Sequence, residues 1–131
     1  MKQRAWDDLL SIGIEEVDND HRILLNLFNL LAEAASEEED DEYLAVVLEE
    51  LINATAWHFS HEERLMLECS YPNLAAHKTE HQDLMDSVRA FQDSWLKDGT
   101  LEADEFEFLE RWLTEHILVS DMKFGSWIAS S

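Results

Sequence analysis

The sequence predicts an all-α fold, an up-down-up-down antiparallel four-helix bundle with an N-terminal arm and a short C-terminal aromatic tail. The first observation is that its 131 residues include only three glycines and one proline, whereas a turn-rich β fold needs more of both. The second is that four stretches repeat apolar residues at the spacing of a helix with one buried face. Helices of similar length with short links are typical of such bundles, and the chain length indicates one domain over residues 1–131.

Acidic residues separate the first two predicted helices. We expect the first helix to run from Asp18, which can cap its N-terminus, to Ser36. Residues 37–42, with the sequence EEEDDE, predict a charged and solvated connection. The second helix then spans residues 43–67 and ends before Pro72.

Turn-forming residues set the limits of the other two helices. Asn73 is expected to cap the third helix, which continues to Lys97 and stops at residues 98–99 (Asp-Gly). The fourth helix is predicted over residues 102–120. The aromatic tail, residues 124–128, follows it.

The composition excludes two classes of partner. Only 9 Lys and Arg residues stand against 30 Asp and Glu, and the formal net charge of −21 argues against binding to nucleic acid or to an anionic membrane. No apolar run approaches about 18 residues, so no membrane insertion is expected, and the start of the chain has no apolar signal region. The single cysteine, Cys69, excludes an intramolecular disulfide and a CxxC pair. We therefore expect a soluble, cytoplasmic protein.

The most informative feature is the position of the histidines. Five of the six lie on the stripes that face the core, and Glu62 lies on one of these stripes as well: His21, His58, His77, His81 and His116. A buried imidazole needs a hydrogen bond or a metal, and a buried carboxylate needs a partner, but apolar stripes offer few partners. We therefore predict a metal site inside the bundle. His61 lies off the stripe and is expected on the surface.

Asp121 is a further candidate ligand, although it follows His116 by five residues, about 140° around an ideal α-helix. It can join the site only if the end of the helix loosens or the carboxylate reaches sideways. Five imidazoles and two carboxylates are too rich in nitrogen for magnesium or calcium, no thiolates favour structural zinc, and one tetrahedral ion cannot use seven ligands. Two octahedral ions bridged by both carboxylates and by an oxo or hydroxo group would leave one position open to a small ligand.

The segments around these residues resemble the hemerythrins, in particular the single-domain bacterial form. The matching segments span almost the whole chain: Trp6 with VDNDH (17–21), HFSHEE (58–63), YPNLAAHKTEH (71–81) and HILVSDMKF (116–124). The resemblance implies two iron ions as the cofactor, joined in an oxo- or hydroxo-bridged centre. One iron would be bound by His77, His81 and His116. The other would be bound by His21 and His58. The bridging carboxylates would be Glu62 and Asp121.

Two positions depart from the usual pattern of that family. Asp20 stands where glutamine is frequent, which leaves the orientation of the neighbouring histidine, His21, open. Phe124 stands where tyrosine is frequent, which removes a hydroxyl near Asp121. Neither residue is a predicted ligand.

The resemblance implies reversible binding of dioxygen by a carrier, storage or local delivery protein, and dioxygen is the partner that the sequence identifies. Apolar residues that neighbour the ligands at helical spacing would form the oxygen pocket: Leu24, Phe59, Trp112, Leu113 and Ile117. Because the stripes hold no further carboxylate or histidine to serve as a catalytic acid, we predict a binding protein and not an enzyme. Two alternatives stay open, an oxygen-sensing module that acts on a partner protein and a di-iron oxidase or peroxidase.

Overall fold

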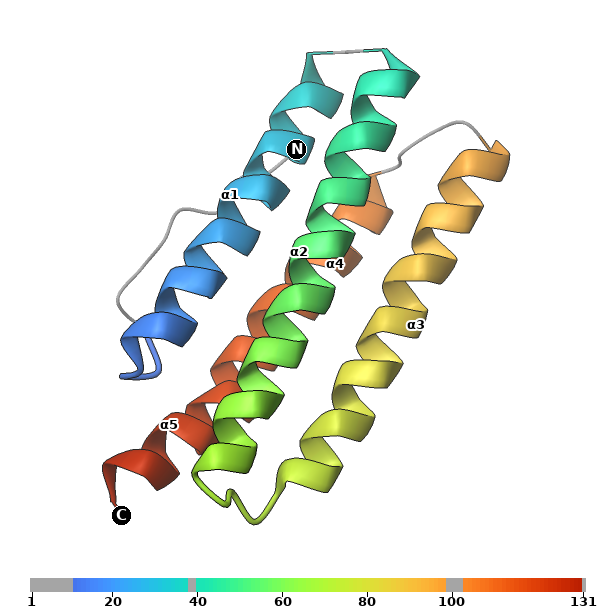
Figure 1. Cartoon of the computed structure of the whole chain (residues 1–131). Coiled ribbons are helices and arrows are strands. Elements are labelled where there is room, and N and C mark those ends of the chain that lie inside the picture. The colour runs from blue at the N-terminus through green and yellow to red at the C-terminus, as the bar shows by residue number, and fades with distance from the viewer. Residues whose placement is uncertain (1–10, 38–39, 99–102, 131) are drawn as a thin grey trace.

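The computed structural model describes residues 11–37, 40–98 and 103–130, and every regular element in these ranges is a helix. Four long helices run side by side in alternating directions (Figure 1): α1 (Glu15–Ser36), α2 (Asp41–Glu68), α3 (Leu74–Asp98) and α4 (Ala103–His116). The last of them continues through a π-helical turn, η2 (Ile117–Asp121), into α5 (Met122–Ala129). The predicted all-α four-helix bundle is confirmed. None of the helices within the described ranges has the length and apolar character needed to cross a membrane.

The start of α1 differs from the prediction. The helix begins at Glu15, and the residue at its N-cap position, Ile14, provides no side-chain hydrogen bond. Asp18 lies in the first turn, where its carboxylate accepts hydrogen bonds from the backbone N–H of Ile12 and the hydroxyl of Ser11. The prediction that Asp18 caps the helix is therefore wrong, because this side chain holds the arm that precedes the helix.

The acidic connection between α1 and α2 is shorter than predicted. The carboxylate of Asp40 accepts a hydrogen bond from the backbone N–H of Tyr43 at 2.8 Å and so caps α2. Asp41 and Glu42 lie in the first turn of that helix. Negative side chains are favourable there, because the helix dipole is positive at its N-terminus.

The later boundaries lie close to the predicted ones. Asn73 immediately precedes α3, and its backbone carbonyl accepts a hydrogen bond from the N–H of His77 at 3.0 Å. The predicted stop at Gly99 and the predicted start at Glu102 lie outside the described residues. The aromatic tail is part of α5, and the N-terminal arm crosses it at Gly125, where an added Cβ would lie 2.0 Å from the carbonyl oxygen of Ile12. A close approach of two backbones is a position that glycine fits.

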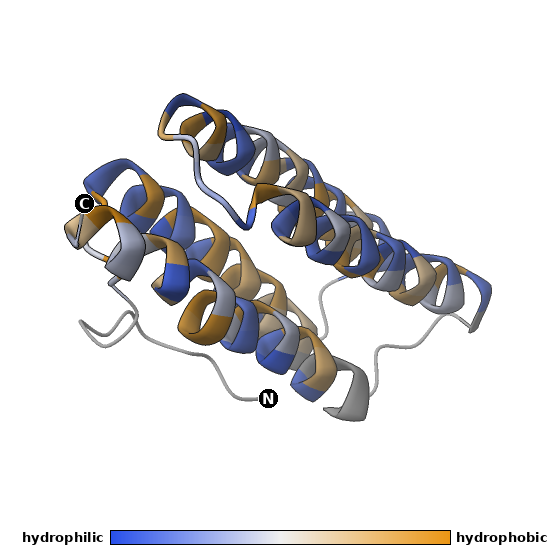
Figure 2. Cartoon of the chain, turned by 90° about the horizontal axis from the view of Figure 1, so that it is seen from below, coloured by the Kyte–Doolittle hydropathy of each residue, from blue (hydrophilic) through white to orange (hydrophobic). Residues whose placement is uncertain are grey.

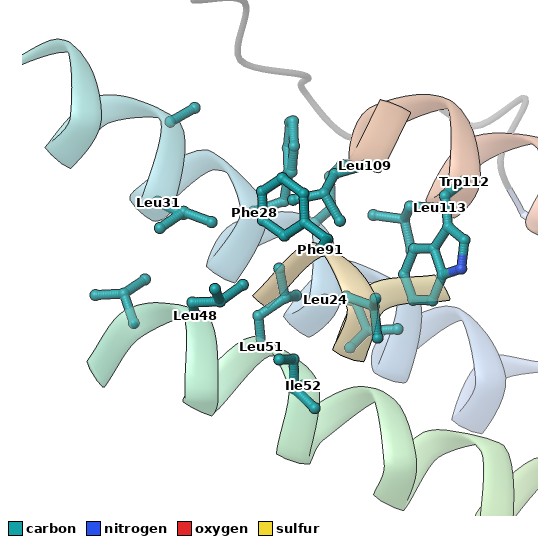
Figure 3. Packing of buried hydrophobic residues seen from close by; sticks show 14 of the residues in the cluster. Leu24, Phe28, Leu31, Leu48, Leu51, Ile52, Phe91, Leu109, Trp112 and Leu113 are labelled. Carbon is teal, nitrogen blue, oxygen red and sulfur yellow. The ribbon is translucent and has the colours of Figure 1, made fainter. Parts of the chain in front are cut away.

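Hydrophobic and hydrophilic residues alternate around each helix (Figure 2), and the buried hydrophobic residues form two clusters. The larger cluster joins the four long helices through residues 24–34 of α1, 44–59 of α2, 88–95 of α3 and 109–117 of α4 and η2 (Figure 3). The smaller cluster consists of Ile12, Val17, Met66, Tyr71 and Phe124. The predicted metal ligands lie where the two clusters approach each other: His21 lies between Val17 and Leu24 on α1, and Glu62 lies between Phe59 and Met66 on α2. The polar site is therefore enclosed at both ends by apolar packing.

Candidate metal centre

The structure brings all seven predicted ligands together between the two hydrophobic clusters. Each is at most 6% exposed. Every helix of the bundle contributes: His21 from α1, His58 and Glu62 from α2, His77 and His81 from α3, His116 from α4 and Asp121 from η2. The seven residues form two overlapping groups, and the ligand atoms of each group lie within 4.8 Å of one another. The larger group holds three histidines (77, 81 and 116) and the smaller holds two (21 and 58), whereas Glu62 and Asp121 belong to both.

Glu62 directs one carboxylate oxygen toward each group. Its Oε1 lies 2.6 Å from Nε2 of His77 and 3.1 Å from Nε2 of His81, both in the larger group. Its Oε2 lies 3.5 Å from Nε2 of His58, in the smaller group. A carboxylate placed in this way is positioned to bridge two cations.

Asp121 divides its oxygens in the same manner. Oδ1 lies 3.0 Å from Nε2 of both His77 and His116, and Oδ2 lies 2.9 Å from Nε2 of His21. The contact with His116 is possible because residues 117–121 form a π-helical turn. The i→i+5 hydrogen bonds of a π-helix bring residues five apart onto one face. The chain after α4 therefore departs from α-helical geometry, as we expected was necessary for Asp121 to reach the site.

Two orphaned oxygens show that the protein alone does not complete this cluster. Glu62 Oε2 and Asp121 Oδ2 are fully buried, and within the described residues neither accepts a hydrogen bond of good geometry. Leaving such atoms unpaired costs a folded protein about 1–3 kcal/mol each, and more for charged groups. The Nε2 atoms of the five histidines converge on the same space, with His21 and His58 3.1 Å apart and His81 and His116 3.2 Å apart. This donor set, five imidazole nitrogens and two shared carboxylates, fits a pair of cations.

Three of the histidines are oriented by carboxylates that the sequence analysis did not assign to the site. The Nδ1–H groups of His58, His81 and His116 donate to Asp20, Glu63 and Glu80 at 2.9, 2.7 and 2.7 Å. A carboxylate at Nδ1 fixes the tautomer and leaves Nε2 free to bind a metal. The sequence held a signal for all three, since each is the direct neighbour of a predicted ligand.

His61 is not a surface residue, and that prediction is wrong. Its side chain is 8% exposed, its Nδ1 contacts the same oxygen of Asp20 that His58 uses, and its Nε2 lies 3.2 Å from Glu16 Oε2. Its position off the stripe reflects a contact between α1 and α2 that the periodicity of one helix does not reveal. Asp20 accordingly orients His58 and not its neighbour His21.

In the metal-free protein the charges of this cluster compensate one another. Burial and the charge of Asp121 alone would raise the pKa of Glu62, but hydrogen bonds from three histidines lower it to about 2. Burial alone would lower the pKa of His116, yet the charge and hydrogen bond of Asp121 and the hydrogen bond of Glu80 raise it to about 10. The carboxylates Asp20 and Glu62 likewise raise the pKa of His58 to about 9. Protons therefore sit where cations would bind, and a metal must displace them.

An apolar cavity adjoins the centre. All five predicted pocket residues line it, together with Thr55, Leu84 and three of the ligand histidines (21, 58 and 116). Leu24, Trp112 and Leu113 are shown with the neighbouring core in Figure 3. The cavity volume of about 10 Å³ is close to the smallest that holds one water-sized molecule. A diatomic molecule in this cavity would contact mainly hydrocarbon beside the ligand histidines.

Comparison with known proteins agrees with this geometry. Residues 12–128 match the hemerythrin HHE cation binding domain. The chain is 32% identical to the bacteriohemerythrin of Pseudomonas paraeruginosa, with all of this chain and 96% of that protein aligned, and 28% identical to the myohemerythrin of Riftia pachyptila, with 92% and 89% aligned. Among solved structures, a wild-type hemerythrin superposes with a TM-score of 0.86 at 24% identity over 95% of this chain and 97% of that chain. This last likeness concerns the fold.

The raised histidine pKa values predict that the metal-free protein loses stability in alkaline solution. A histidine whose pKa rises from 6.5 in the unfolded chain to about 9 or 10 in the folded protein stabilises the fold fully below pH 6.5. That stabilisation disappears as the pH rises through 9 to 10. We expect urea titrations of the metal-free protein to give a free energy of unfolding lower at pH 9.5 than at pH 6 by more than about 1 kcal/mol, the equivalent of one pKa unit. The variant His116→Gln should show a smaller difference, and a metal-free protein that becomes more stable toward pH 9.5 would contradict the charge arrangement.

Proposed function

The chain belongs to the hemerythrin family, and on this premise we propose that it is a single-domain protein that binds dioxygen reversibly at a di-iron centre, as an oxygen carrier, store or local delivery protein. The unequal division of the ligands beside the cavity carries this proposal. The larger group offers five residues and the smaller only four, so an octahedral ion in the smaller group would retain an open position after one further bridging ligand. Both histidines of that group, His21 and His58, line the apolar cavity.

The donor set supports iron. Imidazole nitrogen suits iron, copper, nickel and zinc, whereas two shared carboxylates favour a pair of ions over the single closed tetrahedron of structural zinc. His77, His81 and His116 would hold one ion and His21 and His58 the other, with Glu62 and Asp121 shared between them. When bound, a pair of ferrous ions would supply the reversible two-electron chemistry that binding and release of dioxygen need.

The residues of the chain keep water and protons from the open position. Beyond the ligand histidines, the polar groups of the cavity wall already donate to backbone carbonyls: the hydroxyl of Thr55 to Leu51 at 2.7 Å and the indole N–H of Trp112 to Leu84 at 3.1 Å. The ring of Phe59 stacks on His81, with centroids 3.9 Å apart and planes 7° apart. The wall thus presents hydrocarbon to the ligand, and an apolar wall prevents the proton leakage that would make binding irreversible.

The same wall favours a binding protein over a di-iron oxidase or peroxidase. Among the described residues that line the cavity, the ligand histidines are the titratable ones, so no separate group stands there to deliver the proton that reductive chemistry needs. A role as an oxygen sensor would require a surface that changes with the state of the centre.

Cys69 is exposed and is the single cysteine, which agrees with a reducing compartment such as the cytoplasm.

The spectrum of the iron-loaded protein tests this function. Reduced protein should gain visible absorption bands in air and lose them under argon, and the change should repeat over several cycles. Turnover of added peroxide or ferrous iron in steady state, without a reversible spectral change, would favour the enzyme instead.

Metal content provides a second prediction. We expect two irons per chain, because the two groups hold separate histidines. Removing a shared carboxylate with Glu62→Ala should deplete both ions, whereas His21→Ala should deplete one. The exposed control Asp86→Asn should keep two, and a wild-type protein with a single zinc would contradict the di-iron assignment. Elemental analysis of purified protein decides between these outcomes.

The cavity wall can be tested through Leu113, which is 5% exposed. Leu113→Asn keeps nearly the same volume but offers water a hydrogen-bonding partner. We expect normal iron content and helicity, but the variant should survive several-fold fewer cycles between air and argon before its spectrum stops responding. Leu118→Asn places the same change at a position that is 42% exposed and should behave like the wild type. An unchanged number of cycles in Leu113→Asn would show that this wall does not protect the site.

A further inference from the structure

The three carboxylates that orient ligand histidines differ in their access to water. The side chains of Glu63 and Glu80 are 25% and 40% exposed, whereas that of Asp20 is 8% exposed. Water screens the charge of an exposed carboxylate, but a buried one acts on its partner through a medium of low dielectric constant. Asp20 is therefore the one of the three carboxylates whose charge water screens least.

Asp20 is itself held in place. Its Oδ2 accepts hydrogen bonds from Nδ1 of both His58 and His61. His61 packs against Trp57, with ring centroids 5.0 Å apart, and its other nitrogen faces Glu16. Two donors on one oxygen favour the ionised carboxylate and lower the pKa of Asp20, although burial alone would raise it. His61 thus fixes the position and the charge of the group that contacts His58.

The contact between Asp20 and His58 is the one carboxylate contact that orients a histidine of the two-histidine group among the described residues, whereas the three-histidine group has two such contacts. In the larger group, His81 and His116 are both oriented by a carboxylate. In the smaller group, Nδ1 of His21 has no hydrogen-bond partner among the described residues. His58 is therefore the histidine of that group with an oriented ring, and Asp20 is the residue that orients it.

We propose that Asp20, braced by His61, is the positioning residue of the two-histidine group and sets the affinity of that group for a divalent cation. The carboxylate holds the His58 ring with Nε2 toward the centre and increases the electron density that Nε2 offers. This inference rests on the proposed function for the identity of the ion as iron. The positioning itself applies to any divalent cation that the group binds.

Cobalt(II) bound to the full chain, prepared without other metals, measures this role without dioxygen. The wild type should take up two Co(II) ions per chain, seen in the visible cobalt bands and by calorimetry. Asp20→Asn keeps the shape of the side chain and an acceptor oxygen but removes the charge. We expect one of the two sites to weaken about 10- to 100-fold, the range found for outer partners of metal-binding histidines, and the other to stay unchanged. His21→Ala identifies the affected site, because it should impair the same one.

Asp18→Asn is the matched control, since Asp18 is a buried acid of the same helix that contacts the N-terminal arm and no ligand. It should bind both ions as the wild type does. His61→Ala leaves Asp20 in place but removes the histidine that holds it, so this variant should weaken cobalt binding at the same site less than Asp20→Asn does. If Asp20→Asn does not fold, the cobalt affinity of His61→Ala tests the proposal instead. Unchanged affinity in Asp20→Asn, or equal weakening at both sites, would overturn the proposal.

The iron-loaded protein offers a second readout. A buried negative charge favours the higher oxidation state, so Asp20→Asn should raise the midpoint potential of the centre, and a tenfold change in the redox equilibrium corresponds to 59 mV for one electron. An unchanged potential would overturn the electronic part of the proposal. A wild-type chain that binds two cobalt ions but shows no response of its iron form to air would overturn the proposed function alone.

Discussion

The structure depends on how two buried carboxylate oxygens are compensated. Glu62 Oε2 and Asp121 Oδ2 lie at the centre of the bundle, fully enclosed, and within the described residues neither accepts a hydrogen bond of good geometry, although His58 Nε2 and His21 Nε2 lie 3.5 and 2.9 Å from them. Without a metal, protons on the surrounding imidazoles partly compensate the negative charge of the two carboxylates. Bound cations would take the place of these protons. The apolar clusters on either side exclude water, which makes this compensation both necessary and strong. The apolar packing that stabilises the bundle therefore also makes it unfavourable to leave these two oxygens without a cation.

The centre is asymmetric in composition and surroundings. One group has three histidines and the other two, and the cavity borders both histidines of the smaller group but only His116 of the larger. The smaller number of candidate ligands, the apolar wall and a histidine held by a buried carboxylate, His58, thus coincide at one end of the site. At the other end, the partly exposed carboxylates Glu63 and Glu80 orient two of the three histidines of the larger group. This difference supports the proposal that a small ligand binds beside the two-histidine group.

The bundle and six of the seven candidate ligands could be predicted because both follow from the period of single helices. Five histidines and Glu62 were identified by their spacing along apolar stripes. The position of Asp121 could not be derived in this way, since the π-helical turn at residues 117–121 changes the period. The partnership of Asp20 with His58 and His61 was missed for a different reason. It joins two helices, and the rotation of one helix against another is not encoded in the pattern of either. The prediction that Asp18 caps α1 was wrong because an aspartate that binds the preceding arm and an aspartate that caps a helix occur at similar positions near the start of a helix.

The outer carboxylates connect the site to the fold in a regular order. Asp20, next to the ligand His21 on α1, accepts from His58 on α2, and Glu63, next to Glu62 on α2, accepts from His81 on α3. In the same manner Glu80, beside His81 on α3, accepts from His116 at the end of α4. Each pair of consecutive helices is therefore joined at the level of the centre by a carboxylate that is the sequence neighbour of a ligand. A shift of one helix along its axis would displace its own ligand and the orientation of the ligand on the next helix together. The contacts that join consecutive helices at this level are consequently the same contacts that orient the candidate ligands, so that part of the chain's acidic excess helps to align the bundle.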